Sequence, residues 1–343
     1  MKFSLQLIDR AALIRLTILA LIITSILIFG WSLMVWMPGT SYRQALPPLS
    51  AADRSLQDRL QRDVEMLSAK IGSRNVGNYP NLVAAQEFLD RELTKAGYTV
   101  RAQQYTVAER TYSNLEVEIP GSSLAEQILV VGGHYDSAFT SPGADDNATG
   151  AAAVLALARE FVGTKPLRTL RFVEFTNEEP PFFCTQNMGS FRYAQNAKQR
   201  GDKIVGMFSL ETLGYFTNTA NTQKYPPLLS FLYPDRGDFI SFISDIDSRE
   251  LLRNTIRSFR AQTKFPSEGA AMPNFIQGVG GSDHWSFWQQ GYQALMITDT
   301  ATFRYPFYHT AADTADKIDF EQLSRVTHGI GNVIRDFVGL EGS

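Results

Sequence analysis

The sequence predicts an α/β fold: a three-layer sandwich with a mixed, mainly parallel sheet, helices on both faces, and one preceding N-terminal transmembrane helix. Short apolar runs rich in β-branched residues alternate with segments of helical periodicity through most of the 343 residues. This alternation is typical of parallel strands joined by helical crossovers. Acidic residues and histidines follow several of these runs, where open α/β sheets place their ligands.

Composition excludes several classes of protein. The formal net charge is −3 and no run of lysine and arginine is present, so we expect no nucleic acid as a partner. The single cysteine, Cys184, excludes an internal disulfide and a cysteine-based zinc site, and we expect a buried, inert thiol. Any metal must therefore be held by carboxylates and by the histidines, which are His134, His284, His309 and His328.

Residues 16–37 form the predicted membrane segment. They contain no charged side chain over 22 positions, and Lys2, Arg10 and Arg15 precede them. A signal-peptide core has only about 7–15 apolar residues, whereas a spanning helix needs about 20. We therefore expect an uncleaved signal-anchor, with residues 1–15 in the cytoplasm and everything after Pro38 on the periplasmic or extracellular side. A cleaved signal peptide is the alternative.

Local signals predict the remaining elements in order. A proline-containing linker, 38–50, ends at Ser50, a helix cap followed by apolar residues at helical spacing. Gly97 ends a second helix, and Pro120 and Gly121 end a strand. We expect helices at 51–71, 81–95, 148–162, 189–197, 245–265, 282–290 and 320–340, and strands at 98–105, 112–119, 127–132, 167–175, 203–210 and 292–297. Together they make one domain, 51–343, in which 216–281 is an insertion next to the site.

Candidate ligands follow four of the predicted strands. The strand from 127 leads to His134, the strand from 167 to Glu178 and Glu179, the strand from 203 to Glu211, and the last strand to His309. Taken singly, each has an ordinary structural explanation. Their occurrence at consecutive strand ends predicts that they meet at one edge of the sheet.

A pair of zinc ions suits two histidines and several carboxylates. Such a pair clamps the attacking oxygen, polarises a carbonyl group, and makes hydroxide available near neutral pH. One carboxylate that binds no metal must carry the proton from the water to the leaving amine. Glu178 and Glu179 can divide these two tasks, because neighbouring side chains in extended chain point in opposite directions.

The ordered motifs resemble those of the co-catalytic di-zinc aminopeptidases. These zinc exopeptidases are related to bacterial leucyl aminopeptidases, to glutamate carboxypeptidase II-like ectodomains and, distantly, to glutaminyl cyclases. The resemblance covers roughly residues 82–339, and each motif is weak alone while the ordered set is highly specific. The motifs are GGHYDS, PGADDNATG, NEE, LETLGY, SDHWSF and YHTAADT.

The resemblance implies two zinc ions per chain. Asp146 would bridge them, His134 and Glu211 would complete one site, and Glu179 and His309 would complete the other. The sequence departs from the family at Glu211, where many members have aspartate. Glutamate is an equivalent ligand with a longer reach, so the spacing of the metals is in doubt but metal binding is not.

The resemblance also implies residues that act on the substrate or support a ligand. Glu178 would be the general base that serves a metal-bridged hydroxide, Asp136 would orient the imidazole of His134, and Tyr308 would steady the developing oxyanion. Asp145 competes with Asp146 for the bridging position. The structural alternative for this pair is that it simply caps the following helix, because carboxylates favour helix N-termini. The family pattern favours Asp146.

The sequence therefore predicts a membrane-anchored zinc exopeptidase that acts on peptides, most simply an aminopeptidase with a preference for apolar residues. A carboxypeptidase would need cations for the substrate carboxylate, and Arg192 and Arg304 keep that alternative open. A glutaminyl cyclase and a non-catalytic receptor ectodomain of the same fold are further alternatives. We expect structural positions for His284 and His328.

Overall fold

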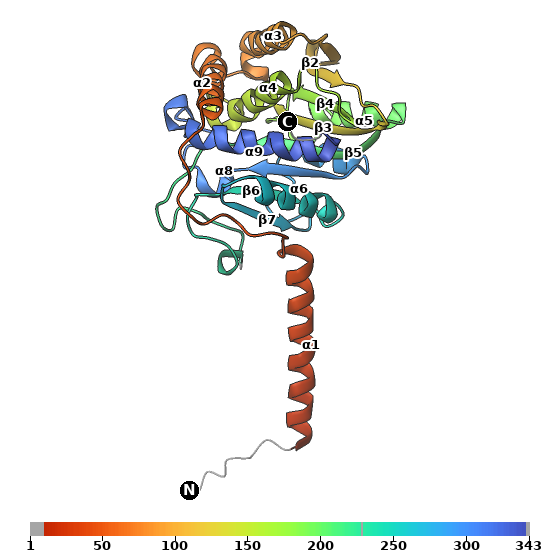
Figure 1. Cartoon of the computed structure of the whole chain (residues 1–343), viewed down its shortest axis with the longest axis vertical. Coiled ribbons are helices and arrows are strands. Elements are labelled where there is room, and N and C mark those ends of the chain that lie inside the picture. Colours follow the sequence, from red (N-terminus) through yellow and green to blue (C-terminus); the bar gives the residue numbers. More distant parts are fainter. Residues whose placement is uncertain (1–9, 228, 341–343) are drawn as a thin grey trace.

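The computed structural model describes residues 10–227 and 229–340, and its centre is one twisted sheet of eight strands (Figure 1). The strands lie in the order β1-β2-β4-β3-β5-β8-β6-β7. Their bounds are Arg101–Val107 (β1), Arg110–Ile119 (β2), Leu124–His134 (β3), Arg168–Phe175 (β4), Lys203–Glu211 (β5), Ile240–Ser244 (β6), Ser267–Ala271 (β7) and Ala294–Thr298 (β8).

Parallel pairing dominates the middle of this sheet. Strand β3 pairs in parallel with β4 and β5, and β5 pairs in parallel with β8. Antiparallel pairs join β1 to β2, β2 to β4 and β6 to β8, whereas β6 and β7 are parallel. The carboxyl ends of β3, β4, β5 and β8 consequently meet at one edge. The mixed, mainly parallel sheet that the sequence predicts is confirmed.

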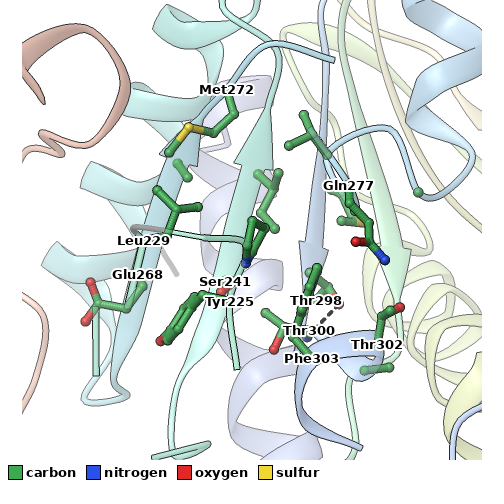
Figure 2. A pocket seen from close by; sticks show the side chains of 18 of the residues that line it. Tyr225, Leu229, Ser241, Glu268, Met272, Gln277, Thr298, Thr300, Thr302 and Phe303 are labelled. Atoms are coloured by element: carbon green, nitrogen blue, oxygen red, sulfur yellow. Dashed lines mark hydrogen bonds between the residues drawn. The ribbon is translucent and has the colours of Figure 1, made fainter. Parts of the chain in front are cut away.

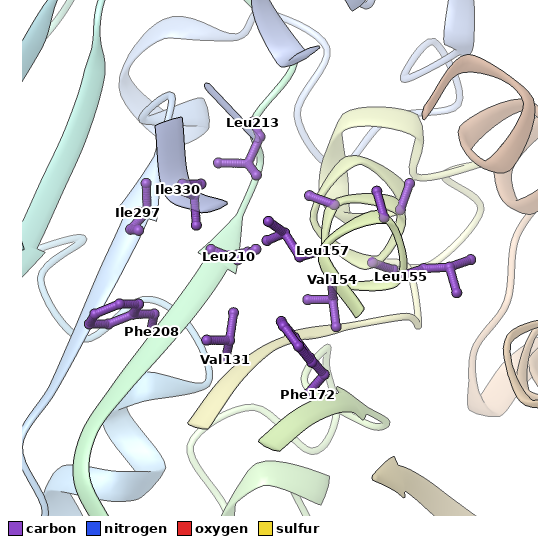
Figure 3. Close-up of a cluster of buried hydrophobic side chains, with 14 of the residues drawn as sticks. Val131, Val154, Leu155, Leu157, Phe172, Phe208, Leu210, Leu213, Ile297 and Ile330 are labelled. Atoms are coloured by element: carbon purple, nitrogen blue, oxygen red, sulfur yellow. The ribbon is translucent and has the colours of Figure 1, made fainter. Parts of the chain in front are cut away.

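Helices cover both faces of the sheet. Alternate residues of each strand point to opposite faces, so Val131 and Phe172 join one core while Val130 and Val173 join the other. The larger core packs the sheet against α2, α3, α4, α6 and α9, and Figure 3 shows the part beneath α4. The helices on this side are Ala51–Glu65 (α2), Tyr79–Lys95 (α3), Gly150–Phe161 (α4), Arg249–Gln262 (α6) and Phe320–Val338 (α9); those on the other side are Gly189–Arg200 (α5) and His284–Gln289 (α7).

Helix α2 begins where the sequence predicts. The Ser50 hydroxyl accepts a hydrogen bond from the Asp53 N–H at 3.0 Å, and the Asp53 carboxylate accepts one from the Ser50 N–H at 3.3 Å. This reciprocal capping box satisfies two otherwise unpaired donors at the helix start. The helix continues into a wider helical turn, η1 (Met66–Ile71). This turn ends at Gly72, whose φ of 82° favours glycine.

Helix α1 (Arg10–Met34) projects from the domain as an isolated rod (Figure 1). Among the residues that the structure describes, it is the one helix long and apolar enough to cross a membrane, and none of its residues is buried. Length and composition of this kind fit a membrane anchor or a signal sequence. Much of the predicted cytoplasmic segment, 1–15, lies outside the described residues.

Two strands within 216–281 were not expected from the sequence. This region contains α6 close to the predicted helix, but also η4 (Leu229–Phe231), β6 and β7. Strands β6 and β7 extend the central sheet beyond β8. Part of the predicted insertion therefore forms one edge of the sheet. The loops before β6 and after β7 line the pocket described below.

Candidate metal centre

The carboxyl ends of the central strands bring the predicted ligands together. His134 is the last residue of β3, Glu211 is the last residue of β5, and Glu179 follows β4. Asp146 lies in the turn before α4, where its φ of −108° and ψ of 92° interrupt the helical path. His309 follows α8 (Ala301–Arg304), the short helix after β8. All but His309 are buried, and the His309 side chain is only 28% exposed.

The carboxylate of Asp146 lies between the two histidines. Its Oδ1 is 3.4 Å from Nε2 of His134, and its Oδ2 is 2.9 Å from Nε2 of His309. Oε2 of Glu211 lies 3.2 Å from the same Nε2 of His134. Beside His309, Oε2 of Glu179 lies 3.3 Å from its Nε2. The five side chains therefore form two groups that share Asp146.

Asp145 points away from the histidines. Its Oδ1 accepts a hydrogen bond from the Gly214 N–H at 2.8 Å, and burial next to Asp299 and Asp313 raises its pKa well above the ordinary value. A carboxylate in this environment supports the loop behind the site. The geometry thus favours Asp146 over Asp145 at the shared position.

Asp136 connects the β3 end to the β4 end. Its two oxygens accept hydrogen bonds from the main-chain N–H groups of Glu178 and Glu179, each at 3.1 Å. Its Oδ1 also lies 3.5 Å from Nδ1 of His134. The predicted neighbour of the imidazole is therefore also the residue that fixes the backbone of both glutamates. The preceding Asn177 has a positive φ of 58°, which turns the chain sharply into this pair.

The cluster carries an excess of buried negative charge. Burial raises the pKa values of Glu178, Glu179 and Glu211, and repulsion among the carboxylates adds to the effect. Burial opposes ionisation of Asp146 as well, but the imidazoles on either side lower its pKa below the ordinary range. Burial likewise disfavours protonated His134, yet the surrounding carboxylates raise its pKa well above 6.5. The cluster needs a compensating cation.

The residues fit metal ions. Ligand atoms of His134, Asp146 and Glu179 all lie within 4.8 Å of one another. Oε1 of Glu179, a buried atom of the cluster, has no hydrogen-bond partner. Unpaired buried acceptors are costly, whereas imidazole nitrogen and carboxylate oxygen are ordinary zinc ligands. The donor set matches zinc in both type and arrangement.

Tyr308 lies at the border between the cluster and a pocket. Its ring stacks on the His309 ring with centroids 3.9 Å apart, and burial next to the site carboxylates raises its pKa well above 10. The phenol is therefore a protonated donor at neutral pH. Phe139, which is 61% exposed, packs edge-on against the His309 ring, with centroids 6.2 Å apart.

The adjoining pocket lies on the sheet surface and has a volume of about 110 Å³ (Figure 2). Strand register aligns Glu211, Thr298, Ser241 and Glu268 in one row across β5, β8, β6 and β7. Apolar side chains from the two flanking loops complete the wall; these include Tyr225, Leu229, Met272 and Ile276. At the far end, Glu268 forms an ion pair with Arg43. The pocket thus begins at a candidate ligand and is mainly apolar.

Two arginines considered for carboxylate binding are engaged elsewhere. The Arg304 guanidinium donates to Gln223 at 2.8 Å and lies over the Phe239 ring at 4.6 Å. Arg192 donates to Asn187 at 3.0 Å and lies over the Tyr105 ring at 5.8 Å. Neither arginine lines the pocket beside the cluster.

The remaining histidines and the cysteine lie outside the cluster. His284 is fully buried, donates from Nε2 to the Val279 carbonyl at 2.7 Å, and has a pKa lowered to about 4 by burial. His328 is half-exposed on α9, where it pairs with Asp53 at 2.5 Å. Cys184 is exposed, so the expectation of a buried thiol is wrong. Its aromatic and proline neighbours form a surface turn rather than a core element.

Two supporting residues were missed by the sequence reasoning. Asp313 accepts hydrogen bonds from the N–H groups of Asp145 at 2.8 Å and Asp146 at 3.2 Å. Ser282 donates to Oε2 of Glu211 at 2.7 Å. Asp313 lies within the motif YHTAADT and Ser282 within SDHWSF. Membership in these motifs is the sequence signal that could have identified both residues.

Comparison with known proteins places this arrangement in a family. The model of Peptidase family M28 matches residues 114–334. The uncharacterized protein YfbL of Escherichia coli is 32% identical over 295 residues, which cover 83% of this chain and 89% of YfbL. A probable leucine aminopeptidase 1 of Trichophyton verrucosum is 24% identical over 320 residues, covering 86% of this chain and 78% of that protein.

Solved structures show the same fold. A zinc aminopeptidase from Bacillus subtilis is similar, with a TM-score of 0.67 and 14% identity, over 86% of this chain and 96% of that one. A glutaminyl cyclase from Fimbriiglobus ruber is similar, with a TM-score of 0.60 and 21% identity, over 88% of this chain and 98% of that one. The family match extends over more than half of the sequence, and the site holds the ligand types that this chemistry requires. The chain belongs to Peptidase family M28 and is a zinc metallopeptidase.

Proposed function

We propose that the protein is a membrane-anchored aminopeptidase that removes N-terminal residues from peptides and uses two zinc ions per chain. The observation that carries this proposal is the position of Asp146, whose two oxygens face two different histidines. Glu211 would complete the group at His134, and Glu179 the group at His309. Bound zinc would supply Lewis-acid polarisation of the scissile carbonyl and a water of lowered pKa.

Glu178 is the proposed general base. Its carboxylate approaches the cluster, with Oε2 3.9 Å from Nε2 of His134, while Asp136 fixes its backbone. Glu178 takes a proton from the attacking water as the oxygen bonds to the carbonyl carbon. It then gives that proton to the amide nitrogen as the carbon–nitrogen bond breaks. The Tyr308 hydroxyl donates to the oxyanion formed on the former carbonyl oxygen.

The pocket beside Glu211 is proposed to hold the side chain of the N-terminal residue. Its walls are mainly apolar, and its one distant carboxylate, Glu268, is already paired with Arg43. This environment favours aliphatic and aromatic side chains. The engagement of Arg304 and Arg192 in other contacts supports an aminopeptidase over a carboxypeptidase. The one cation among the described residues that line the pocket, Lys224, is exposed and donates a hydrogen bond to the Asn221 carbonyl at 2.8 Å.

Helix α1 is proposed to span the membrane, with the catalytic domain on the extracytoplasmic side. The positive residues that precede the apolar stretch support this orientation. Full-length protein should remain with the membrane fraction after washing at high pH, and added protease should digest the catalytic domain from the extracytoplasmic side. Release of the chain as a soluble form that lacks α1 would support a cleaved signal peptide instead.

The chemical proposal is tested with Glu178→Gln. We expect zinc content to be unchanged and kcat on aminoacyl anilides to fall about 10²–10⁴-fold, because the amide cannot accept the proton. Glu321→Gln, which alters an exposed glutamate on α9, is the control and should keep full activity. Full activity of Glu178→Gln would refute the mechanism.

Substrate panels separate the alternatives. Peptides with a free N-terminus should be cleaved faster than N-blocked peptides with a free C-terminus, and Leu or Phe anilides faster than Asp anilides. Preferential cleavage of the N-blocked peptides would indicate a carboxypeptidase. Cyclisation of N-terminal glutamine without peptide cleavage would indicate a glutaminyl cyclase.

A further inference from the structure

Helix α6 lies against the chain segment that follows α1. The Arg253 guanidinium lies over the Trp36 ring at 5.1 Å and donates a hydrogen bond to the Ser32 carbonyl at 2.5 Å. Seven residues along α6, Arg260 donates to the carbonyl oxygens of Pro38 at 3.1 Å and Gly39 at 3.3 Å. The catalytic domain is thus bound directly to the end of α1 and does not hang from a free linker.

These contacts fix the level of α6 relative to a bilayer. The apolar stretch ends at residue 37, and a tryptophan at the end of a spanning helix occupies the headgroup region. Because Arg253 contacts both Trp36 and Ser32, the α6 surface lies at that same level. A long arginine side chain can reach this interface while its charge remains hydrated.

The α6 region is basic although the whole chain is acidic. Residues 245–264 contain five basic and three acidic residues, a formal charge of +2, against −3 for the complete sequence. Arg249, Arg253 and Arg257 recur every four residues and therefore share one side of the helix. Arg257 is exposed, and Glu250 is the carboxylate that pairs with both Arg249 and Arg253.

An exposed apolar tip lies beside the same segment. Phe231 is 84% exposed and Leu232 is 48% exposed. The next residue, Tyr233, donates from its hydroxyl to the Gly269 carbonyl at 2.9 Å. Gly269 in turn packs on Met37, whose Cγ lies 3.0 Å from the position that a β-carbon would occupy. In Figure 1, β6, β7 and α6 lie at the end of the domain from which α1 leaves.

We propose that α6 and the tip at Phe231 and Leu232 form a surface that binds the headgroups of anionic phospholipids. The arginines would contact the phosphates, and Phe231 would enter the interface as an apolar anchor. This inference rests on the membrane-spanning position proposed for α1 and is independent of the peptidase chemistry. The tip shares a segment with Leu229 and Tyr233 of the pocket wall, so lipid contact would hold the pocket mouth next to the membrane.

A site-directed spin label tests the proposal in the full-length protein. A nitroxide would be attached at Phe231→Cys in a Cys184→Ser background, with the protein in nanodiscs of phosphatidylcholine alone or mixed with phosphatidylglycerol. In the anionic nanodiscs we expect at least a several-fold fall in collisions with a water-soluble nickel complex and a rise in collisions with oxygen. A label at Thr94→Cys, an exposed position on α3 at the opposite end of the domain, should stay water-accessible.

Charge reversal separates lipid binding from a simple loop contact. The double variant Arg249→Glu/Arg257→Glu keeps Arg253 and Arg260, which hold the α1 end. We expect it to lose the protection of the label at 231 in anionic nanodiscs while it keeps the hydrolysis of soluble anilides. Equal water access of the labels at positions 231 and 94 in both kinds of nanodisc would overturn the proposal. Protection of the label at 231 that the charge reversal leaves unchanged would also overturn it. Absence of peptidase activity in every sample would contradict the proposed function alone.

Discussion

The carboxylate of Asp136 accepts a hydrogen bond from the main-chain N–H of Glu178 at 3.1 Å and, through its other oxygen, holds Glu179 at the same distance. One side chain therefore positions both the proposed base and a proposed ligand, while it also lies 3.5 Å from the His134 ring. Asp136 couples the ends of β3 and β4.

Asp136→Asn should impair activity more than folding. The amide offers one acceptor oxygen where the carboxylate offers two, so one of the two glutamate N–H groups loses its partner. We expect a 10–100-fold fall in kcat/KM on an aminoacyl anilide or in zinc affinity, the range found for residues that support metal ligands. Unchanged activity and unchanged zinc affinity would show that the backbone contact is dispensable.

Removal of metal should lower the stability of the protein. The buried carboxylates lose their compensating charge, and a ligand present at a thousandfold over its Kd contributes about 4 kcal/mol. Chelation should lower Tm by on the order of 10 °C, as measured by calorimetry, and added zinc should restore it. Asp146→Asn should show little response to chelator or zinc, whereas Glu178→Gln should respond as the wild type does. A response that persists in Asp146→Asn would place the metal elsewhere.

His284 should make stability depend on pH. Burial lowers its pKa in the folded protein to about 4, so between pH 6.5 and 4 the unfolded chain binds a proton that the folded chain does not. Stability is unaffected above pH 6.5 and falls as the pH drops below it, by about 3 kcal/mol in total. Denaturant unfolding should show that the free energy of unfolding falls between neutral pH and about pH 5 by roughly 2 kcal/mol more in the wild type than in His284→Gln. Equal losses in both proteins would mean that the imidazole titrates normally.

Gly150→Ala should damage the turn that presents Asp146. A β-carbon there would lie 2.3 Å from the Leu210 carbonyl oxygen and from Oδ1 of Asn147. We expect a loss of about 1–3 kcal/mol in the free energy of unfolding, together with lower zinc affinity. Gly163→Ala is the matched comparison, because its β-carbon would meet nothing within 4 Å and only its φ of 74° is unfavourable. It should cost about 1–2 kcal/mol and leave zinc affinity unchanged.

Hydrophobic pattern predicted the central strands and most helices to within a few residues, because each buries long runs of apolar side chains. It missed β6 and β7, which have only five residues each and include serine, glutamate and glycine. Such strands are held by their neighbours in the sheet rather than by their own composition. The burial of Cys184 was wrongly predicted because apolar neighbours alone do not distinguish a core from a surface turn.

The order of motifs predicted which side chains meet at the sheet edge, but the residues that support them depend on contacts between distant parts of the chain. Asp313 binds the N–H of Asp145 from 168 positions away. No local pattern encodes that contact. The row from Glu211 to Glu268 also depends on the register of four strands, of which two were not predicted.

The spread of the cluster along the chain has a consequence for biogenesis. His134 and His309 belong to opposite halves of the domain sequence, and they approach Asp146 only after β3, β5 and β8 have paired. Long-range strand pairing forms late compared with local helices. A nascent chain that has not yet reached His309 would therefore have no complete zinc site. Hydrolytic activity would begin only when the whole domain has folded.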